Sequence, residues 1–574
     1  MREIVTIQVG NYANFVGSHF WNFQDELLGL GDTPDSSQVF KDHSLNMDVL
    51  YRSGETQQGT LTYTPRLVSV DFQGSLGSMS SRGTLYGEAS SGLSDVVTWT
   101  GRVTAQASEP LKRNLFLQSL YEEEQANESL NNCLDTGRTE TRNEIQATDI
   151  IECLENNVKY WTDFAKVHYH PQSLYELNGL WMDIQDFNNY GMGRDAFTGL
   201  QHGEEITERL RFFIEECDHI QGLQFITNDA GGFSGVAGEF LENIADDYTN
   251  IPVLLYCVRS PDLPVRTKSQ RPTVSNSLHD AISFSRLSAF GKLIVPIGLP
   301  SLTKSKASRF LSIEDEKPFH SSAVYASAIH SISLPLRMER PSPSVDLINA
   351  SGAADMSELI QMLAGQARQN MVTTLDVAMP PPSLSGNHFK QSLLENLQPL
   401  TPDTGEDIED LQALETISIH GVLGAGGQES TVSEVNDAVQ AAYENAVRRP
   451  RFSHLSVSRC PLPIPLPFPS IFGNLVGQRG ELLETPIVGP SSRDSLDVHS
   501  IPMAARLRSS TAILPFLEKR LHNLRRYGIQ QGALGSGLIK DWGFGKDEIE
   551  DMGETLSKMV FTLNPYCEES SDTD

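Results

Sequence analysis

Short apolar runs alternate with amphipathic helical patterns through the first half of the chain. The first run, Ile4–Val9, ends at Gly10, and apolar residues recur at helical spacing from Asn14 onward. Similar runs occupy 63–71, 223–227, 253–258 and 293–297, and helical patterns occupy 204–216 and the residues before Tyr248. Short apolar runs bounded by glycine turns are typical of buried strands. Their alternation with helices predicts an α/β fold with a largely parallel sheet.

Length and local composition predict three regions. A chain of 574 residues exceeds what one hydrophobic core supports. We expect a nucleotide-binding-type domain at 1–260, a second α/β domain at 261–390, and a loop-rich and helical region at 391–574 that ends in an acidic tail. Residues from about 121 to 157 are rich in Asp and Glu and poor in large apolar side chains. That composition predicts an exposed insertion, and we expect further loops at 74–92 and 300–318.

The charge of the chain restricts its partners. There are 44 Lys and Arg residues against 74 Asp and Glu, so the formal net charge is −30. Non-specific binding to nucleic acid requires dense cations that displace counterions, so we expect no nucleic-acid partner. An acidic surface is suited to solubility or to a basic protein partner.

Cysteine usage and hydropathy predict a cytosolic protein. The six cysteines are scattered without a CxxC pair, which favours reduced thiols over a disulfide framework or a zinc site. The chain opens with a predicted strand rather than a targeting segment, and no apolar stretch reaches the roughly 18 residues of a membrane span. His168 and His170 lack a third ligand at a convincing spacing. We therefore expect no metal site, and only peripheral contact with any membrane.

Two glycine-containing turns follow predicted strands and precede predicted helices. Their candidate binding residues are Gly10, Asn11, Tyr12 and Asn14 in the first turn, and Gly231, Gly232, Ser234 and Gly235 in the second. Unpaired amides and the helix dipole converge at such turns and bind phosphate, and glycine lets the backbone approach the phosphate oxygens. The same pattern also occurs as a tight turn without a ligand, so both alternatives stay open here.

Both turns lie in segments that resemble tubulin. Met1–Val5, followed by Gly10, Asn14, Gly17 and Phe20-Trp21, resembles the opening of tubulin with its first nucleotide-contacting loop. Glu216–Gln224 resembles the segment just before the glycine-rich phosphate loop of that family. The resemblance is strongest at 1–30, 61–75 and 200–260. It implies a tubulin-like fold in the first half of the chain, with the two turns at the nucleotide site.

The same segments depart from the tubulin pattern where a nucleotide would bind. Asn11-Tyr12-Ala13 stands in place of Gln-Cys-Gly, Phe233 in place of a threonine, Val236 in place of a glycine, and Gln73 in place of an acidic residue that helps to hold the metal. A neutral amide is a poorer Mg²⁺ ligand than a carboxylate. We therefore expect no resident cofactor and weakened or absent binding of GTP.

Hydrolysis in the tubulin family also needs an acidic loop from a neighbouring subunit. We align that loop and its helix with Phe319–Tyr325, which contains no carboxylate. Without one, this segment cannot orient an attacking water. We therefore expect no catalytic residue, and a protein that is not an enzyme.

An amphipathic helix is predicted near the C-terminus. Leu514, Leu517, Leu521 and Leu524 share one helical face, and the cations Lys519, Arg520, Arg525 and Arg526 punctuate the same segment. One interpretation is a helix packed on the body of the protein, as the C-terminal helices of tubulins are. The other is a contact of these cations with anionic lipid or an acidic partner.

The chain length, the acidic segment and the altered phosphate turns together resemble the Misato family of tubulin-related proteins. That resemblance implies a regulator of mitochondrial distribution and morphology, found in the cytoplasm and peripherally at the cytosolic face of the mitochondrial outer membrane. We expect a non-enzymatic adaptor with protein partners in the mitochondrial or cytoskeletal machinery, acting in network organisation or fusion. Two alternatives stay open: a divergent GTP-binding switch involved in cytoskeleton or spindle organisation, and direct membrane remodelling through the 514–526 helix.

Overall fold

A computed structural model of the chain describes most of its residues. These are 2–33, 37–41, 45–55, 61–80, 112–132, 146–182, 187–199, 201–261, 274–340, 350–365, 369–384, 396–405, 410–424, 427–446, 449–530 and 533–564. Most of the predicted loop at 74–92 and the whole of the acidic tail at 567–574 lie outside this set.

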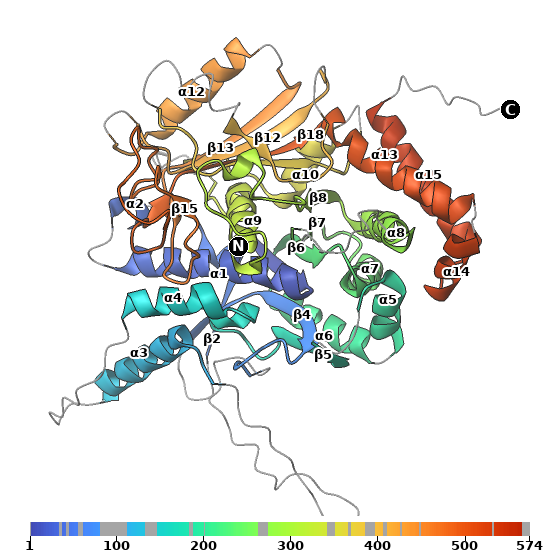
Figure 1. The fold of residues 1–574 in the computed structure, drawn as a ribbon, viewed down its shortest axis with the longest axis horizontal. Helices are drawn as coiled ribbons and strands as arrows, with labels where there is room; N and C mark the ends of the chain where they lie inside the picture. The colour runs from blue at the N-terminus through green and yellow to red at the C-terminus, as the bar shows by residue number, and fades with distance from the viewer. Residues whose placement is uncertain are drawn as a thin grey trace, which may run out of the picture.

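The first half of the chain folds around a parallel sheet of six strands (Figure 1). In order across the sheet these are β5 (Leu174–Trp181), β4 (Leu67–Gln73), β1 (Glu3–Val9), β6 (Ile220–Asn228), β7 (Val253–Val258) and β8 (Leu293–Ile297). Every neighbouring pair runs parallel. β1 and β7 are buried along their whole length, as expected for a parallel sheet covered on both faces. The predicted α/β class is confirmed.

Helices cover both faces of this sheet because alternate residues of each strand point to opposite sides. Ile4 of β1 belongs to the core that contains α1 (Asn11–Asp32) and α9 (Pro318–Ser333). The neighbouring Val5 belongs to the core on the other face. Helices in that core include α6 (His202–Glu215), α7 (Gly232–Asp247) and α8 (Val274–Phe290).

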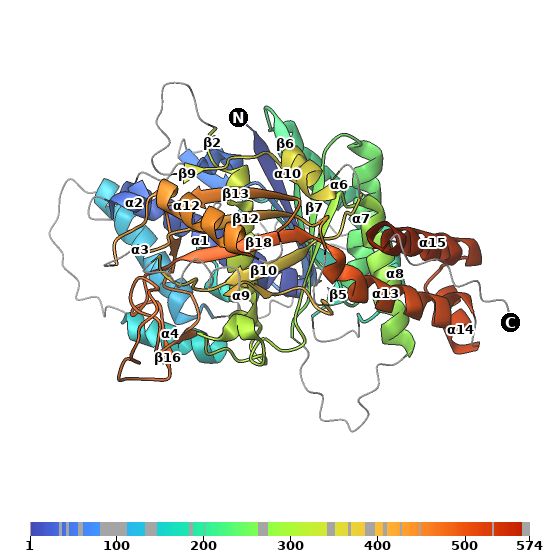
Figure 2. The ribbon, with the colours of Figure 1, turned by 90° about the horizontal axis from the view of Figure 1, so that it is seen from above.

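A mixed sheet of six strands forms a second layer (Figure 2). Its order is β11 (Gln398–Pro399), β10 (Thr374–Ala378), β18 (Met503–Ser509), β12 (Leu414–His420), β13 (Phe452–Ser458) and β9 (Ala350–Ser351). β12 and β13 are parallel, whereas β18 is antiparallel to both of its neighbours. Helix α9 packs against α1 and also against β18 and β12. It is therefore a central helix between the two sheets, and Phe319–Ser333 are all buried.

The C-terminal part of the chain adds helices beside α8 (Figure 1). These are α13 (Leu514–Asn523), which continues into a π-helical turn at Leu524–Ile529, α14 (Ala533–Asp541) and α15 (Lys546–Leu563). Smaller elements are α2 (Gln38–Lys41), α10 (Met356–Ala364), α12 (Val432–Asn445) and the strand pairs β2 (Tyr51–Glu55) with β3 (Leu61–Pro65), β14 (Leu462–Pro463) with β17 (Ser500–Ile501), and β15 (Phe472–Gly473) with β16 (Ser492–Arg493). The predicted helical C-terminal region is present.

The layers do not follow the expected region boundaries. β8 belongs to the parallel sheet although it lies beyond residue 260, and the second sheet takes strands from both sides of residue 390. Sheet pairing joins segments that are distant in sequence. Local composition therefore gives no signal for where one layer ends and the next begins.

The acidic segment also differs from the expected exposed insertion. Its described residues form the end of α3 (Leu115–Asn132) and the whole of α4 (Ala147–Asn157). Ile150, Ile151 and Leu154 of α4 are buried. They lie at spacings of one, three and four residues, so they share one helical face. The expectation of an exposed segment is therefore wrong for α4, and 133–145 lie outside the described residues.

Candidate functional site

The two glycine turns meet at the centre of the parallel sheet. From β1 the chain passes to β4 on one side and later returns to β6 on the other. The carboxyl ends of β1 and β6 therefore flank the point where strand order reverses, which is where open α/β sheets bind ligands. Gly10 precedes α1 with φ 103°, and Gly231 precedes α7 with φ 71°. Both conformations favour glycine. Helix α1 begins at Asn11, earlier than the predicted start at Asn14.

The two turns are in direct contact with each other. The Ala13 amide, in the first turn of α1, donates to Oδ1 of Asn228 at the end of β6, at 2.9 Å. A Cβ atom on Gly10 would lie 2.9 Å from Cγ of Phe233 and 3.0 Å from Cβ of Asn228. Glycine is required at position 10 for this close approach. The structure thus brings the predicted residues of the two turns together.

Protein groups already accept hydrogen bonds from the amides of the second turn. The Gly231 amide donates to Nε2 of His279 on α8 at 3.0 Å. The Gly232 amide donates to the carbonyl oxygen of Phe187 at 3.0 Å. Burial lowers the pKa of His279 to about 4, so the imidazole is neutral near pH 7 and its Nε2 accepts. These two amides, which lie where a helix start would bind a phosphate, therefore donate to groups of the protein itself.

Ser234 and Gly235, the other candidate residues of the second turn, contact neighbouring helices. The Ser234 hydroxyl bonds to the carbonyl oxygen of Gly231 and to the Ser283 hydroxyl, both at 2.8 Å. A Cβ on Gly235 would lie 2.3 Å from the Tyr190 carbonyl oxygen, in the first turn of α5 (Tyr190–Gly199). Helix α5 thus sits directly on the first turn of α7. Gly235 serves this packing, which is the ligand-free alternative for the turn.

An aromatic cluster fills the space over Gly10. The Phe233 side chain is 4% exposed. Its ring centroid lies 4.6 Å from that of Phe72 and 5.3 Å from that of Phe187. Phe233 stands where the tubulin pattern has a threonine, so the substitution places an apolar ring where a hydroxyl is expected.

A buried carboxylate lies beside the first turn, and sequence analysis missed it as a site residue. Asp71 Oδ2 accepts from Nδ2 of Asn14 at 3.1 Å, from Nδ2 of Asn11 at 3.3 Å and from Nε1 of Trp161 at 3.0 Å. Burial raises the pKa of Asp71 to about 6. Its position at the end of a predicted strand, two residues before Gln73, was the available signal. Gln73 itself faces β5, where its Oε1 accepts from the Gly179 amide at 3.1 Å.

Tyr12 connects the first turn to the central helix. Its hydroxyl lies 2.8 Å from Oγ of Ser321 on α9, and its ring meets Tyr325 edge-on at 6.2 Å between centroids. Phe319–Tyr325, which we aligned with the acidic loop and its helix, lies wholly within the buried helix α9. The carboxylate of Glu155 lies 2.8 Å from Nε2 of His320 in this same segment. The lack of an acidic residue in 319–325 consequently says nothing about hydrolysis.

The other candidate residues do not form a common site. Among the described residues, no group of three or more His, Cys, Asp or Glu is arranged to hold a metal ion. The ring of His170 stacks on that of Phe212 with centroids 5.0 Å apart. Within the same part of the chain, no helix is long and apolar enough to cross a membrane.

Of the four C-terminal cations, Arg520 is buried and the other three are exposed. Arg520 is 5% exposed and its guanidinium lies over the Phe516 ring, 3.3 Å from the centroid. Lys519 is exposed and pairs with Asp403 at 2.9 Å. Arg525 donates to the Ser557 hydroxyl at 2.9 Å, and Arg526 lies over the Tyr527 ring at 5.3 Å. These contacts fit the interpretation of a helix packed on the body of the protein.

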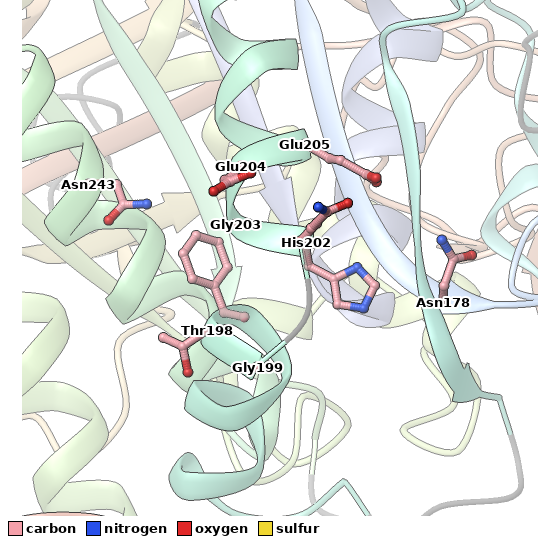
Figure 3. Close-up of a pocket in the computed structure, with 10 residues that line it drawn as sticks. Asn178, Thr198, Gly199, His202, Gly203, Glu204, Glu205 and Asn243 are labelled. Atoms are coloured by element: carbon pink, nitrogen blue, oxygen red, sulfur yellow. The ribbon is translucent and has the colours of Figure 1, made fainter.

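A cavity of about 790 Å³, lined by none of the candidate residues of the glycine turns, lies between the end of α5, the start of α6 and β5 (Figure 3). His202 and Glu205 line it. The Tyr175 hydroxyl donates to Oε2 of Glu205 at 2.8 Å and lies 2.6 Å from Nδ1 of His202. Tyr175 therefore links His202 and Glu205 in the wall of the cavity. No motif in the sequence marks this cavity.

Family comparison agrees with the fold. Residues 2–122 match the Misato Segment II tubulin-like domain, and residues 152–338 match the tubulin domain. The interval between the two matches coincides with most of the acidic segment. The parallel sheet with glycine turns at its reversal point thus defines a protein of the tubulin-like class.

Relatives in animals and fungi narrow this class. Protein misato homolog 1 of Mus musculus is 27% identical over 584 residues, with 97% of both chains covered. Protein misato homolog 1 of Danio rerio is 30% identical over 418 residues, covering 67% of this chain and 68% of its own. Protein DML1 of Gibberella zeae is 28% identical over 378 residues, covering 63% and 68%. The chain belongs to the Misato family.

Proposed function

We propose that this protein is a non-enzymatic, tubulin-like adaptor that regulates mitochondrial distribution and morphology at the cytosolic face of the outer membrane. One observation supports the non-enzymatic part: the amides of the second turn are bonded to His279 and Phe187, and Phe233 packs over Gly10. A site whose donors and volume are already used inside the protein favours a scaffold over a GTPase. The mitochondrial part rests on the family to which the chain belongs.

The site of action is tested by fractionation and imaging. In cells depleted of the protein, we expect a collapsed or misdistributed mitochondrial network that the full chain restores. On intact mitochondria, external protease should remove the bound protein, since the proposal places it on the cytosolic face. A normal network after complete depletion, or full protection from protease, would contradict the proposal.

A divergent GTP-binding switch is the second candidate, and one observation favours it. Gly10 and Gly231 lie in left-handed conformations at the reversal point of the sheet, with the carboxylate of Asp71 alongside. If α5 and Phe233 moved apart from α7, this arrangement would expose two helix N-termini to a phosphate. Hydrogen exchange at the first turns of α1 and α7, measured with and without GTP and Mg²⁺, separates the candidates. Protection induced by GTP supports the switch, and unchanged exchange supports the scaffold.

A further inference from the structure

The loop at 301–311 differs in charge from the rest of the chain. It contains Lys304, Lys306 and Arg309 and no Asp or Glu, in a chain whose formal net charge is −30. All three side chains are exposed. An anion approaching an acidic protein is repelled by most of its surface, so a local group of cations is where it meets the least repulsion.

Among the described residues, these three cations have no carboxylate partner. No carboxylate in the described parts of the chain forms an ion pair with Lys304, Lys306 or Arg309. The guanidinium of Arg309 lies over the neighbouring Phe310 ring, 5.3 Å from its centroid. That stacking restricts the side chain but leaves its donors available for an oxyanion.

The cations line a concave site. A cavity of about 660 Å³ lies between this loop, with its short helical turn η4 (Lys306–Ser308), and the second sheet. The opposite wall is formed by Met379 and Pro380 after β10 and by Asn396 and Gln398 at β11. A single phosphoryl group fits well within such a volume, whereas a flat bilayer surface cannot enter it.

Internal contacts hold the loop in place. Oδ1 of Asp315 accepts from the backbone amides of Leu302 and Thr303, at 2.9 and 3.1 Å. Its Oδ2 accepts from the Ser301 hydroxyl at 2.5 Å. The carbonyl oxygen of Phe310 accepts from the Gly473 amide at 2.9 Å. Asp315 thus shapes the loop, and the cations are presented on a fixed backbone, which lowers the entropic cost of binding.

We propose that this cavity binds a phosphorylated ligand through Lys304, Lys306 and Arg309. A phosphate dianion presents several strong acceptor oxygens, and Arg with two Lys residues supplies charge-assisted donors for them. The phosphoryl group belongs either to a small phosphorylated molecule or to a phosphorylated segment of a partner protein. This site lies outside the two glycine turns and does not depend on whether they bind nucleotide.

The test compares two soluble probes on the full-length protein at low salt. Pyrophosphate is titrated by calorimetry, and a fluorescein-labelled serine-phosphorylated peptide is titrated by anisotropy beside its unphosphorylated form. We expect saturable binding of at least one probe. Replacing the cations together (Lys304→Gln, Lys306→Gln and Arg309→Gln) should weaken that binding about tenfold or more, since three charge-assisted contacts are lost. Thermal unfolding verifies that the exposed substitutions leave the fold intact.

A matched control removes the same charge elsewhere. Lys292, Lys540 and Lys558 are exposed and lie outside the residues that line the cavity. Their joint replacement by Gln should change affinity less than about threefold, through long-range charge alone. If pyrophosphate binds and only the triple substitution in the cavity weakens that binding, the ligand is a small phosphorylated molecule. If the phosphopeptide binds and pyrophosphate does not, the ligand is a phosphorylated segment of a partner protein. The proposal is overturned if neither probe binds, if both variants weaken binding equally, or if the cavity cations matter only for binding vesicles of phosphatidylcholine and phosphatidylserine.

Discussion

The second glycine turn and the basic loop at 301–311 differ in how the described residues use their hydrogen-bond donors and cations. In the second glycine turn, the amides of Gly231 and Gly232 donate to protein acceptors and α5 covers the helix start. In the loop, Lys304 and Lys306 face a cavity. A sequence motif therefore indicates ligand binding only if its donors are not satisfied by the fold itself.

The largest effect should come from emptying the aromatic cluster over Gly10. Phe233→Ala removes a buried ring, so we expect the free energy of unfolding to fall by about 3–5 kcal/mol in denaturant titrations. Phe561 is 57% exposed, so Phe561→Ala should change the free energy of unfolding by less than about 0.5 kcal/mol. Equal small losses in both variants would show that Phe233 is not packed and that the turn is open.

Replacing glycine by alanine should have opposite effects on stability at Gly235 and at Gly29. Gly235→Ala places a methyl group 2.3 Å from the Tyr190 carbonyl oxygen, so α5 must shift, at a cost of about 1–3 kcal/mol in the free energy of unfolding. Gly29 in α1 has nothing within 4 Å of the added Cβ. Gly29→Ala should be neutral or stabilise by up to about 1 kcal/mol through helix propensity. A neutral Gly235→Ala would mean that α5 does not cover the turn.

The pH dependence of stability tests the buried carboxylate. Burial raises the pKa of Asp71 from 3.8 to about 6, so folding favours the protonated form. The associated stability is complete below the unfolded pKa and is lost as the pH rises through the folded pKa. Relative to Asp71→Asn, the wild-type free energy of unfolding should fall by about 1.4 kcal/mol between about pH 5 and about pH 7.5. Parallel pH profiles of the two proteins would show that Asp71 does not titrate with a raised pKa.

The smallest effect is expected at a surface cation that already has a partner. Lys519 is exposed and pairs with Asp403 at 2.9 Å. Among the described residues, the cations of the basic loop have no such carboxylate partner. A double-mutant cycle with Lys519→Ala and Asp403→Ala should give a coupling energy below about 1 kcal/mol, because water and salt screen exposed pairs. A coupling of several kcal/mol would indicate a buried pair and a different packing of α13.

The sequence predicts much of the parallel sheet because its strands are marked locally. Ile4–Val9 and Val253–Val258 are apolar runs, and both appear as buried strands. The glycines at positions 10 and 231 also predict the turns, because a tight turn depends on a backbone conformation that glycine readily adopts. The polarity of the acidic segment hides α4, because three buried residues suffice to anchor a helix whose other faces are charged.

What fills the turns is not predictable from the local sequence. His279 and Phe187 reach the second turn from other elements, and Tyr190 brings α5 onto it. Each of these contacts depends on how distant segments pack, which leaves no periodic signal in the chain. The basic loop shows the converse: its charge pattern is visible in sequence, but the cavity beside it exists only where β10 and β11 meet the loop.

Because the amides of Gly231 and Gly232 donate to protein acceptors, we infer that the tubulin-like turns bind no nucleotide. The most direct measurement is the nucleotide content of the freshly purified full-length protein, followed by calorimetric titration with GTP in the presence and absence of Mg²⁺. We expect no guanine nucleotide on denaturation and no saturable binding at millimolar GTP. Release of stoichiometric guanine nucleotide, or Mg²⁺-dependent binding in the micromolar range, would contradict the account and establish the turns as a working nucleotide site.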